Sequence, residues 1–444
     1  MMKYKNTRDS ISTELLLWRE PSTQISVKDV YSIKVHPTST LYNESTINFN
    51  IPPQMKGMMT NIDIITKFKI KKGNSNLVAA DNCSIINNFA NSLWELVGVQ
   101  VGDRLDLMQS MRNSYSYQTF FDYALNSDKN REDYLFSTQL FKMDSGETKS
   151  GSETMIFTGD GIINKGAAQR HQRIALSNSV TVSSRLHCPL ITTEKALPSN
   201  MKVRVSLSKN NDKFLLMSST DEFKVVIEDI HLRVSYIRPH DIFHDMIEKR
   251  IAREPAPYYI TRPELVVKPI SQSGRHVRVN NIYPGRLPKY SFFCIVKTAD
   301  FEGRSATSGF NFIPYGKFQL FLEGNPYFPE PLEMEYKTKG GVKHYTENRT
   351  FLEQLYSTIG RSGRGCGMVT SENFQLNFMV GLSLTDDRSP TTSPYLSSQR
   401  AVSSQVEIDF GYDINIADDM LLLCYSVYDR LITIDGGRNI EIID

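Results

Sequence analysis

Residues 85–127 change their hydrophobic period in mid-course, from two residues to between three and four. Val97, Val99 and Val101 fall on one face of the chain, which is the period of a half-buried strand. The Gly102-Asp103 pair then predicts a tight turn into a short return strand, because glycine tolerates a positive φ. After this hairpin an aromatic helix face is predicted, formed by Tyr117, Phe120, Phe121, Ala124 and Leu125.

Two-residue periods recur on both sides of this stretch, so the chain is otherwise built of strands. In the first half they are Tyr31 to Val35, Ile47 to Ile51, Ile62 to Ile70, Ile174 to Cys188, Val203 to Leu207 and Val226 to Ile237. In the second half they are Val277 with Val279, Phe318 to Leu322, Phe374 to Val380 and Val406 to Phe410. A single helix among so many strands favours a decorated β-sandwich over βαβ units.

The second half repeats this plan with a helix and loops of its own. Thr350-Phe351-Leu352-Glu353 has the spacing of a capping box, and Gly360 is a plausible helix end. The apolar stripe of this predicted helix is Leu352, Leu355, Tyr356 and Ile359. In the first half, residues 144–170 are rich in Gly, Ser, Thr and Lys without a period, which predicts a long exposed loop.

The length of 444 residues favours two domains, since a single core seldom grows so large. Pro239 to Arg253 has helical character, and the Pro255-Ala256-Pro257 segment that follows predicts a boundary. The predicted division is an arm at 1–27, a first sandwich at 28–238, a connector at 239–257 and a second sandwich at 258–444.

The charge and cysteine content exclude several classes of protein. The net charge is +2, and the sequence shows no basic arm or stripe of the kind that neutralises DNA phosphates. The five scattered cysteines, without a C-x-x-C pair, predict reduced thiols in an intracellular protein. Thr13 to Trp18 is too short and too charged for a secretory signal, and the apolar run Met420 to Tyr428 is too short to span a bilayer.

Three motifs suggest chemistry, and each has a simpler interpretation. His240 and His244 have the i, i+4 spacing of metal ligands, but without a third ligand a polar linker helix is favoured. The glycines of Gly360 to Gly367 follow a predicted helix instead of opening one, which favours a flexible loop over a phosphate cradle. His187 and Cys188 are neighbours on a strand and point to opposite faces, so they form no nucleophile and base pair.

The remaining candidates have equally simple explanations. The carboxylate pairs Asp386-Asp387 and Asp418-Asp419 suit solvated turns. Tyr327-Phe328, between two prolines, is either a contact patch or ordinary loop packing. The sequence therefore predicts no catalytic, cofactor-binding or metal-binding residue, no cofactor and no enzyme activity.

Several segments, in order, resemble the double jelly-roll major capsid proteins of Polinton/Maverick elements, adintoviruses and polinton-like viruses. The resemblance is carried by Ile86 to Leu93, Val97 to Leu105, Asn113 to Tyr117, Val203 to Ser219, Val226 to Ile237, Phe310 to Gly324 and Asp435 to Asn439. It implies an all-β protein with two antiparallel eight-stranded jelly-roll sandwiches in tandem, each decorated by a short helix.

The resemblance also implies a function and a set of partners. Three chains would form a pseudo-hexagonal capsomer, and capsomers would tile an icosahedral shell around a DNA genome. The expected partners are further copies of the chain, penton and minor capsid proteins, and DNA at most weakly and non-specifically. The expected location is the virion capsid, assembled inside the host cell without secretion, and an internal membrane stays an open question.

Two other classes of function remain as alternatives. A carbohydrate-binding or carbohydrate-active β-sandwich would need an acidic and aromatic cleft, whose carboxylates can be distant in sequence. A viral spike or penton protein usually has one jelly roll, whereas this chain has length for two.

Overall fold

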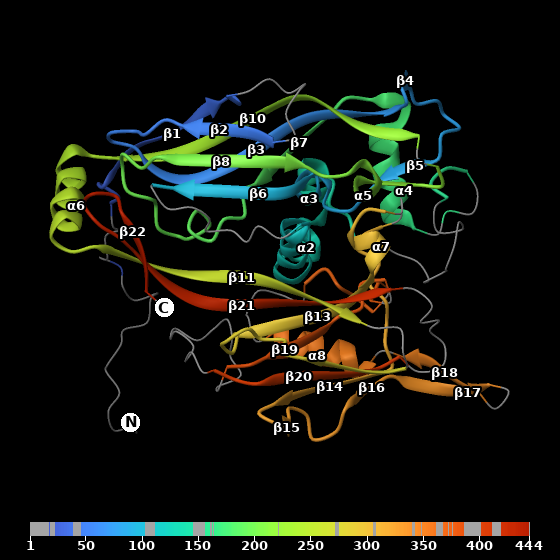
Figure 1. Cartoon of the computed structure of the whole chain (residues 1–444). Helices are drawn as coiled ribbons and strands as arrows, with labels where there is room; N and C mark the ends of the chain where they lie inside the picture. Colours follow the sequence, from blue (N-terminus) through green and yellow to red (C-terminus); the bar gives the residue numbers. More distant parts are fainter. Residues whose placement is uncertain are drawn as a thin grey trace.

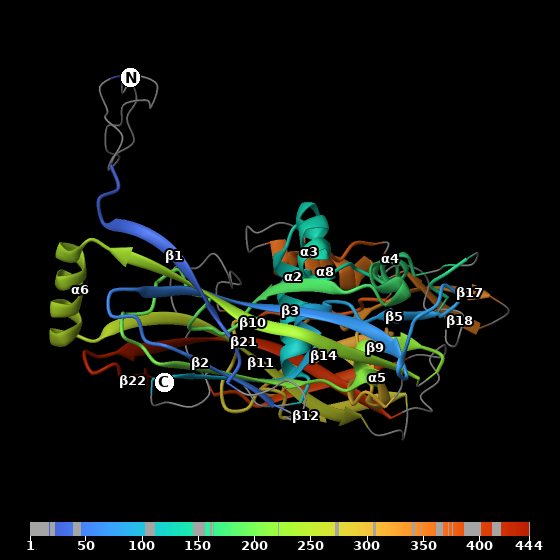
Figure 2. The same cartoon turned by 90° about the horizontal axis from the view of Figure 1, so that it is seen from above.

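The computed structural model describes residues 17, 23–38, 46–102, 112–144, 156–159, 162, 164–220, 222–270, 275–304, 308–339, 342–347, 349–360, 367–371, 373–374, 376–385, 401–410 and 419–443. Its main sheets lie one above another in four layers, two from each half of the chain (Figure 1). The connecting helix α6 lies at one end of the elongated molecule, and the β17–β18 hairpin lies at the other (Figures 1 and 2).

The strands of the first half form two facing sheets and one short pair. The outer sheet contains β1 (Val27–Val35), β10 (Phe223–Pro239), β3 (Met58–Lys72), β4 (Ser75–Asn76) and β7 (Val180–Arg185). The facing sheet contains β2 (Thr46–Ile51), β8 (Val203–Lys209) and β6 (Trp94–Val101), and the short pair is β5 (Cys83–Ile85) with β9 (Leu216–Ser218).

The strands of the second half form a similar pair of sheets. One contains β11 (Ala256–Ile270), β21 (Met420–Ile434), β13 (Tyr290–Lys297), β19 (Val380–Ser383) and β22 (Ile440–Ile443). The other contains β12 (His276–Asn280), β20 (Ser404–Asp409), β14 (Lys317–Leu322), β15 (Asn325–Pro326) and β16 (Leu332–Glu333). A separate hairpin is formed by β17 (Glu335–Lys339) and β18 (Val342–Glu347).

The two halves pair their strands in the same order. In the first half β1 pairs with β10, β10 with β3 and β3 with β7. In the second half β11 pairs with β21, β21 with β13 and β13 with β19. In the facing sheets β8 lies between β2 and β6, as β20 lies between β12 and β14. All these pairings are antiparallel, so the duplicated plan is a property of the topology.

Helices occupy the connections, and the first half has more of them than the single one predicted. They are α1 (Phe89–Ser92), α2 (Ser114–Asn126), α3 (Glu132–Gln139), α4 (Lys165–Ile174) and α5 (Asp212–Leu215), with short 3-10 turns at Lys129–Arg131 and Ala175–Ser177. The connector helix is α6 (Asp241–Arg253), and the second half contains α7 (Thr298–Phe301) and α8 (Arg349–Gly360). The predicted helices at 117–125 and in 239–253 are confirmed.

Three local predictions need correction. The predicted exposed loop at 144–170 contains the start of α4. Arg170 in this helix is fully buried, and its guanidinium is neutralised there by Asp144 at 2.6 Å. In the predicted strand at Phe374 to Val380, the described residues form a strand only from Val380 onward. Helix α8 begins at Arg349, so Thr350 lies inside its first turn and not at a cap.

The inward face of α8 also differs from the predicted stripe. Phe351, Leu355 and Thr358 are buried, whereas Leu352 and Tyr356 are half-buried. The return strand predicted after Gly102 falls on residues 103–111, outside the described ranges.

Candidate functional site

Helix α2 lies between the two sandwiches, where it contacts β6 of the first and β11 of the second (Figure 1). The predicted aromatic face is confirmed as buried, and its rings pack against the second half. Phe120 stacks on Phe310 with 4.4 Å between ring centroids, and Phe121 lies 5.1 Å from Tyr425. We call this set of contacts the aromatic seam. Its other ring pairs are Tyr117 with Phe301 and Phe310, Phe120 with Phe312, Phe121 with Phe312, and Phe214 with Phe310.

Polar contacts fix the register of the seam at the start of α2. Asn113 has a left-handed backbone, φ 58°, and its amide donates to the carbonyl of Phe301 at 2.6 Å. The same side chain accepts a hydrogen bond from Asn210 at 2.7 Å. Tyr117 donates its hydroxyl proton to the Gly309 carbonyl at 2.5 Å, and burial raises the pKa of Tyr117 well above its usual value. The hydroxyl therefore stays protonated and keeps donating.

Three glycines of the second half permit the close approach. A Cβ at Gly303 would lie 2.9 Å from the Phe214 Cβ, and one at Gly309 would lie 2.7 Å from the Phe214 ring. A Cβ at Gly367 would lie 2.9 Å from the carbonyl oxygen of Ala124, near the C-terminal end of α2. The next residue, Met368, donates its backbone N–H to that same carbonyl at 2.7 Å. Any side chain at Gly367 would therefore push this segment away from the helix.

The apolar run Met420 to Tyr428 belongs to β21, a strand buried on both faces. Tyr425 contacts Phe121 of α2 on one face. Cys424 lies on the other face, opposite Phe293, whose ring packs on Phe318 of the facing sheet. A strand covered on both sides needs apolar residues at successive positions, which explains the absence of a two-residue period.

Its counterpart in the first half, β10, is covered by the described residues on one side only. The outer face of its sheet carries ion pairs, Lys69 with Glu228 at 2.6 Å and Arg233 with Asp63 at 2.8 Å. This face forms the outermost layer of the chain at the top of Figure 1. Equivalent strands thus have different surroundings, because the first half covers the second, whereas no described residue covers the outer face of the first.

A second contact between the halves involves the connector helix α6. Arg438, in the turn between β21 and β22, meets Glu248 of α6 at 2.6 Å and donates to the Ser199 carbonyl at 2.8 Å. Ser199 donates its hydroxyl to Glu248 at 2.8 Å. Partial burial opposes ionisation of Glu248, but the hydrogen bonds from Arg438 and Ser199 prevail and lower its pKa. We call this cluster the α6 clamp.

The histidines considered as metal ligands belong to α6 and its start. His244 Nε2 lies 3.2 Å from Ser199 Oγ, so this imidazole joins the α6 clamp. His240 precedes the helix and is exposed. Among the residues that the structure describes, no group of three or more His, Cys, Asp or Glu side chains is placed to hold a metal ion.

His187 and Cys188 have separate surroundings. His187 Nδ1 lies 3.0 Å from Asp122 Oδ2, and its Nε2 lies 2.8 Å from the Tyr123 hydroxyl, both on α2. Cys188 is fully buried, and burial raises the pKa of its thiol to about 11. A thiol with this pKa is protonated near neutral pH and is a poor nucleophile. Through its contacts with Asp122 and Tyr123, the His187 imidazole positions α2.

The other predicted candidates lie largely outside the described ranges. Residues 361–366 of the glycine-rich loop, the Asp386-Asp387 pair and Asp418 are among them. The backbone carbonyl of Asp419 accepts a hydrogen bond from the N–H of Thr298 at 2.9 Å, beside α7. Sequence reasoning missed the contacts between the halves that Asn113, Gly367 and the α6 clamp make. For β21, the long apolar run was the sequence signal of a strand covered on both faces.

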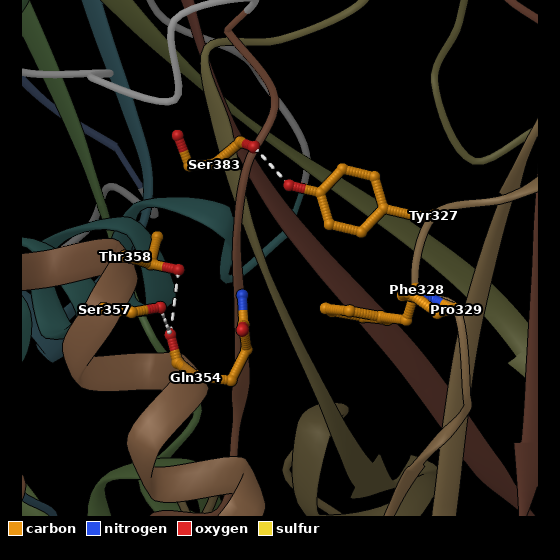
Figure 3. A pocket seen from close by; sticks show the side chains of 7 residues that line it. All are labelled: Tyr327, Phe328, Pro329, Gln354, Ser357, Thr358 and Ser383. Atoms are coloured by element: carbon orange, nitrogen blue, oxygen red, sulfur yellow. Dashed lines mark hydrogen bonds between the residues drawn. The ribbon is translucent and has the colours of Figure 1, made fainter.

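Tyr327 and Phe328 line a pocket of about 150 Å³ between the β15–β16 loop and α8 (Figure 3). The two rings meet edge to face, 4.9 Å apart, and Tyr327 donates its hydroxyl proton to the Ser383 carbonyl at 2.6 Å. The rest of the lining is Pro329, Gln354, Ser357, Thr358 and Ser383. None of these described lining residues carries a carboxylate, the group that a glycosidase uses as acid and base.

The fold can now be compared with known proteins. A chain of the Sputnik virophage, solved by cryo-EM, superimposes with a TM-score of 0.62 over 99% of this chain and 93% of its own, at 9% identity. The Faustovirus major capsid protein gives 0.58 over 95% and 93%, also at 9% identity. The mavirus major capsid protein gives 0.54 over 100% and 96%, at 10% identity. The chain has the double jelly-roll fold.

Sequence comparison detects much less of this likeness. No family model matches the chain. The uncharacterized protein F54H12.2 of Caenorhabditis elegans is 20% identical over 361 residues, which cover 80% of each protein. The double jelly roll is thus recognised mainly from topology. No helix within the described ranges is both long and apolar enough to cross a membrane.

Proposed function

We propose that this double jelly roll is a major capsid protein, whose copies build an icosahedral shell. The observation that carries the proposal is the repeated sandwich. Both halves have the same strand order, and their four sheets lie one above another, so that a sheet of the second half lies against the first half (Figure 1). A stack of this kind has two different outer faces, so further copies add head to tail. Head-to-tail contacts close into a ring when the rotation between neighbours divides a full turn.

Three copies would place six sandwiches around one axis, and this is the capsomer that we propose. The contact between copies would bury about 2,000 Å² or more, as obligate interfaces do. The major capsid proteins of Faustovirus and mavirus share the fold, which supports a structural and non-enzymatic role. We also propose a Polinton-type origin, which the resemblance of the sequence segments implies.

Further parts of the proposal concern domains, partners and location. We propose an arm at 1–27, jelly rolls at 28–238 and 258–444, and a connector at 239–257. The partners would be neighbouring capsomers, penton and minor capsid proteins, with DNA contacted weakly at most because the net charge is only +2. The location would be the virion capsid, assembled inside the host cell.

The test is the mass and the outline of the purified protein. Mass photometry should give three times the chain mass of 50.6 kDa, and negative-stain images should show particles with three-fold or pseudo-hexagonal outlines. Stable monomers at micromolar concentration, without such outlines, would contradict the proposal.

A further inference from the structure

Equivalent sheets of the two halves end in edge strands, β1 in the first half and β11 in the second. The prolines of β11 are Pro257, Pro263 and Pro269. Val427 pairs with Pro263 but directs its carbonyl to the N–H of Lys289, just before β13, so the backbone of Pro263 faces away from β21. Pro257 and Pro269 lie an even number of residues away and face the same way. This edge therefore offers no continuous row of N–H donors to a further strand.

Strand β1 contains no proline and lies at the edge of its sheet (Figure 2). The N–H groups that face outward from it are those of Val30, Ser32 and Lys34. This direction follows from the register, because the Ile62 carbonyl on β3 faces β7 and accepts a hydrogen bond from the Leu186 N–H. The partner of Ile62 on β10 therefore faces β1 and pairs with Ile33, so the neighbours of Ile33 face outward. None of these outward N–H groups donates a hydrogen bond to a described residue.

The side chains along β1 set the chemistry of a strand that could pair with it. Val30 is 67% exposed, and Tyr31 and Ile33 are half-buried on the opposite face of the strand. Lys34 near one end and Asp29 near the other are both exposed. An antiparallel partner strand therefore needs apolar residues in its middle, an anion opposite Lys34 and a cation opposite Asp29.

Residues 14–20 of the chain, Glu-Leu-Leu-Leu-Trp-Arg-Glu, have this pattern. In the antiparallel register with Leu17 opposite Tyr31, Glu14 meets Lys34 and Arg19 meets Asp29. In the same register Trp18 covers Val30, and Leu15 covers Ile33. A shift of one residue in either direction would oppose like charges, Arg19 with Lys28 or Glu20 with Asp29, and would turn each side chain to the wrong face.

We infer that residues 14–20 of one copy add to β1 of a neighbouring copy as an antiparallel strand, an exchange that rests on the proposed assembly. Leu17 is 75% exposed in the single chain, so its side chain does not cover Tyr31 of its own copy. The occupant is therefore a second copy of the chain. Main-chain hydrogen bonds to Val30, Ser32 and Lys34 provide the affinity, and the charge pairs at both ends fix the register.

The experiment joins the two copies by a disulfide. R19C and D29C are placed on separate, differently tagged chains that are co-expressed, so that only two copies together can form the 19–29 link. In the inferred register these positions form a non-hydrogen-bonded pair with Cα atoms about 4.5 Å apart, which a disulfide can bridge. After mild oxidation the 19–29 link should be at least about tenfold more frequent than the 19–32 link of the control R19C with S32C, which is out of register. Position 32 is exposed on the same strand, and the native cysteines among the described residues are buried.

A second variant tests the backbone of the edge. S32P, placed on the D29C chain, removes an outward N–H and leaves the pairing of β1 with β10 in place, as the outward prolines of β11 do. The S32P chain should keep the circular dichroism spectrum of the wild type. It should lower the frequency of the 19–29 link at least about fivefold, because the incoming strand loses a hydrogen bond and meets the proline ring.

The possible results separate this inference from the proposed function. If copies assemble but the 19–29 link is no more frequent than the 19–32 link, or if it is unchanged by S32P, the strand exchange is wrong. A 19–29 link that forms only within single chains of the double variant R19C/D29C would also overturn it, because the segment would then pair with its own copy. A wild-type protein that never assembles would instead refute the proposed function.

Discussion

At the scale of single residues, buried polar groups decide how the halves meet. Asn113 and Tyr117 donate to backbone carbonyls of the second half, and Arg438 bonds Glu248 and Ser199. Hydrogen bonds hold only at set distances and angles, so they specify one register where apolar packing alone would tolerate several. A hydrophobic pattern carries no information on such pairs, and for this reason sequence analysis did not identify them.

The α6 clamp predicts a dependence of stability on pH. The pKa of Glu248 is below its usual 4.5 in the folded chain, so its contribution is complete above that value and is lost as pH falls through the folded pKa. E248Q should lower the free energy of unfolding by about 1–2 kcal/mol at neutral pH. Below about pH 4.5 the wild type should approach E248Q. Urea unfolding of both proteins from pH 7 to pH 3 measures this difference, and a constant gap across the range would contradict the assignment.

At the scale of elements, period-two patterns predicted those strands that have one face buried. Strands β2, β3, β8 and β20 follow the predicted alternation. The pattern was uninformative for β21, which is covered on both faces, and it gave the wrong stripe for α8, where Phe351 lies inside in place of Leu352. The aromatic face of α2 was predicted correctly, but its partner was not, because a period gives the direction of a side chain and not what it meets.

The segment at Gly367 and Met368, which packs on the C-terminal end of α2, offers a test of the contact between the halves. G367A should destabilise the chain by about 1–3 kcal/mol, because φ is +68° and the new Cβ would meet the Ala124 carbonyl. G73A is the matched control, since Gly73 also has a positive φ, +56°, but has no atom within 4 Å of the added Cβ. Denaturant unfolding should therefore show a larger loss for G367A than for G73A. Equal losses would mean that the contact with α2 is unimportant.

At the scale of the whole molecule, we expect the aromatic seam to join the two sandwiches into one folding unit. The second half leaves the apolar face of β21 uncovered unless α2 is in place, so the halves should unfold together. Calorimetry of the wild type should show a single transition. F120A removes a ring that stacks on Phe310, and it should cost about 3–5 kcal/mol or separate the transition into two.

The control for F120A is Y134A, an aromatic position on α3 that is 65% exposed. Its unfolding free energy should stay within about 0.5 kcal/mol of the wild type. Two separate transitions in the wild type itself would show that the sandwiches are energetically independent.

Segments close to both ends of the described chain contact α6 or the residue just before it. The His240 N–H donates to the Ser26 carbonyl at 3.0 Å, just before β1. The turn that leads into the last strand, β22, packs on α6, where a Cβ at Gly436 would lie 3.1 Å from the Ala252 Cα. A peptide inserted just ahead of residue 23 and one attached after Ile443 would therefore begin at the same end of the molecule. A binder raised against either peptide would approach that end and leave the β17–β18 end untouched (Figure 1).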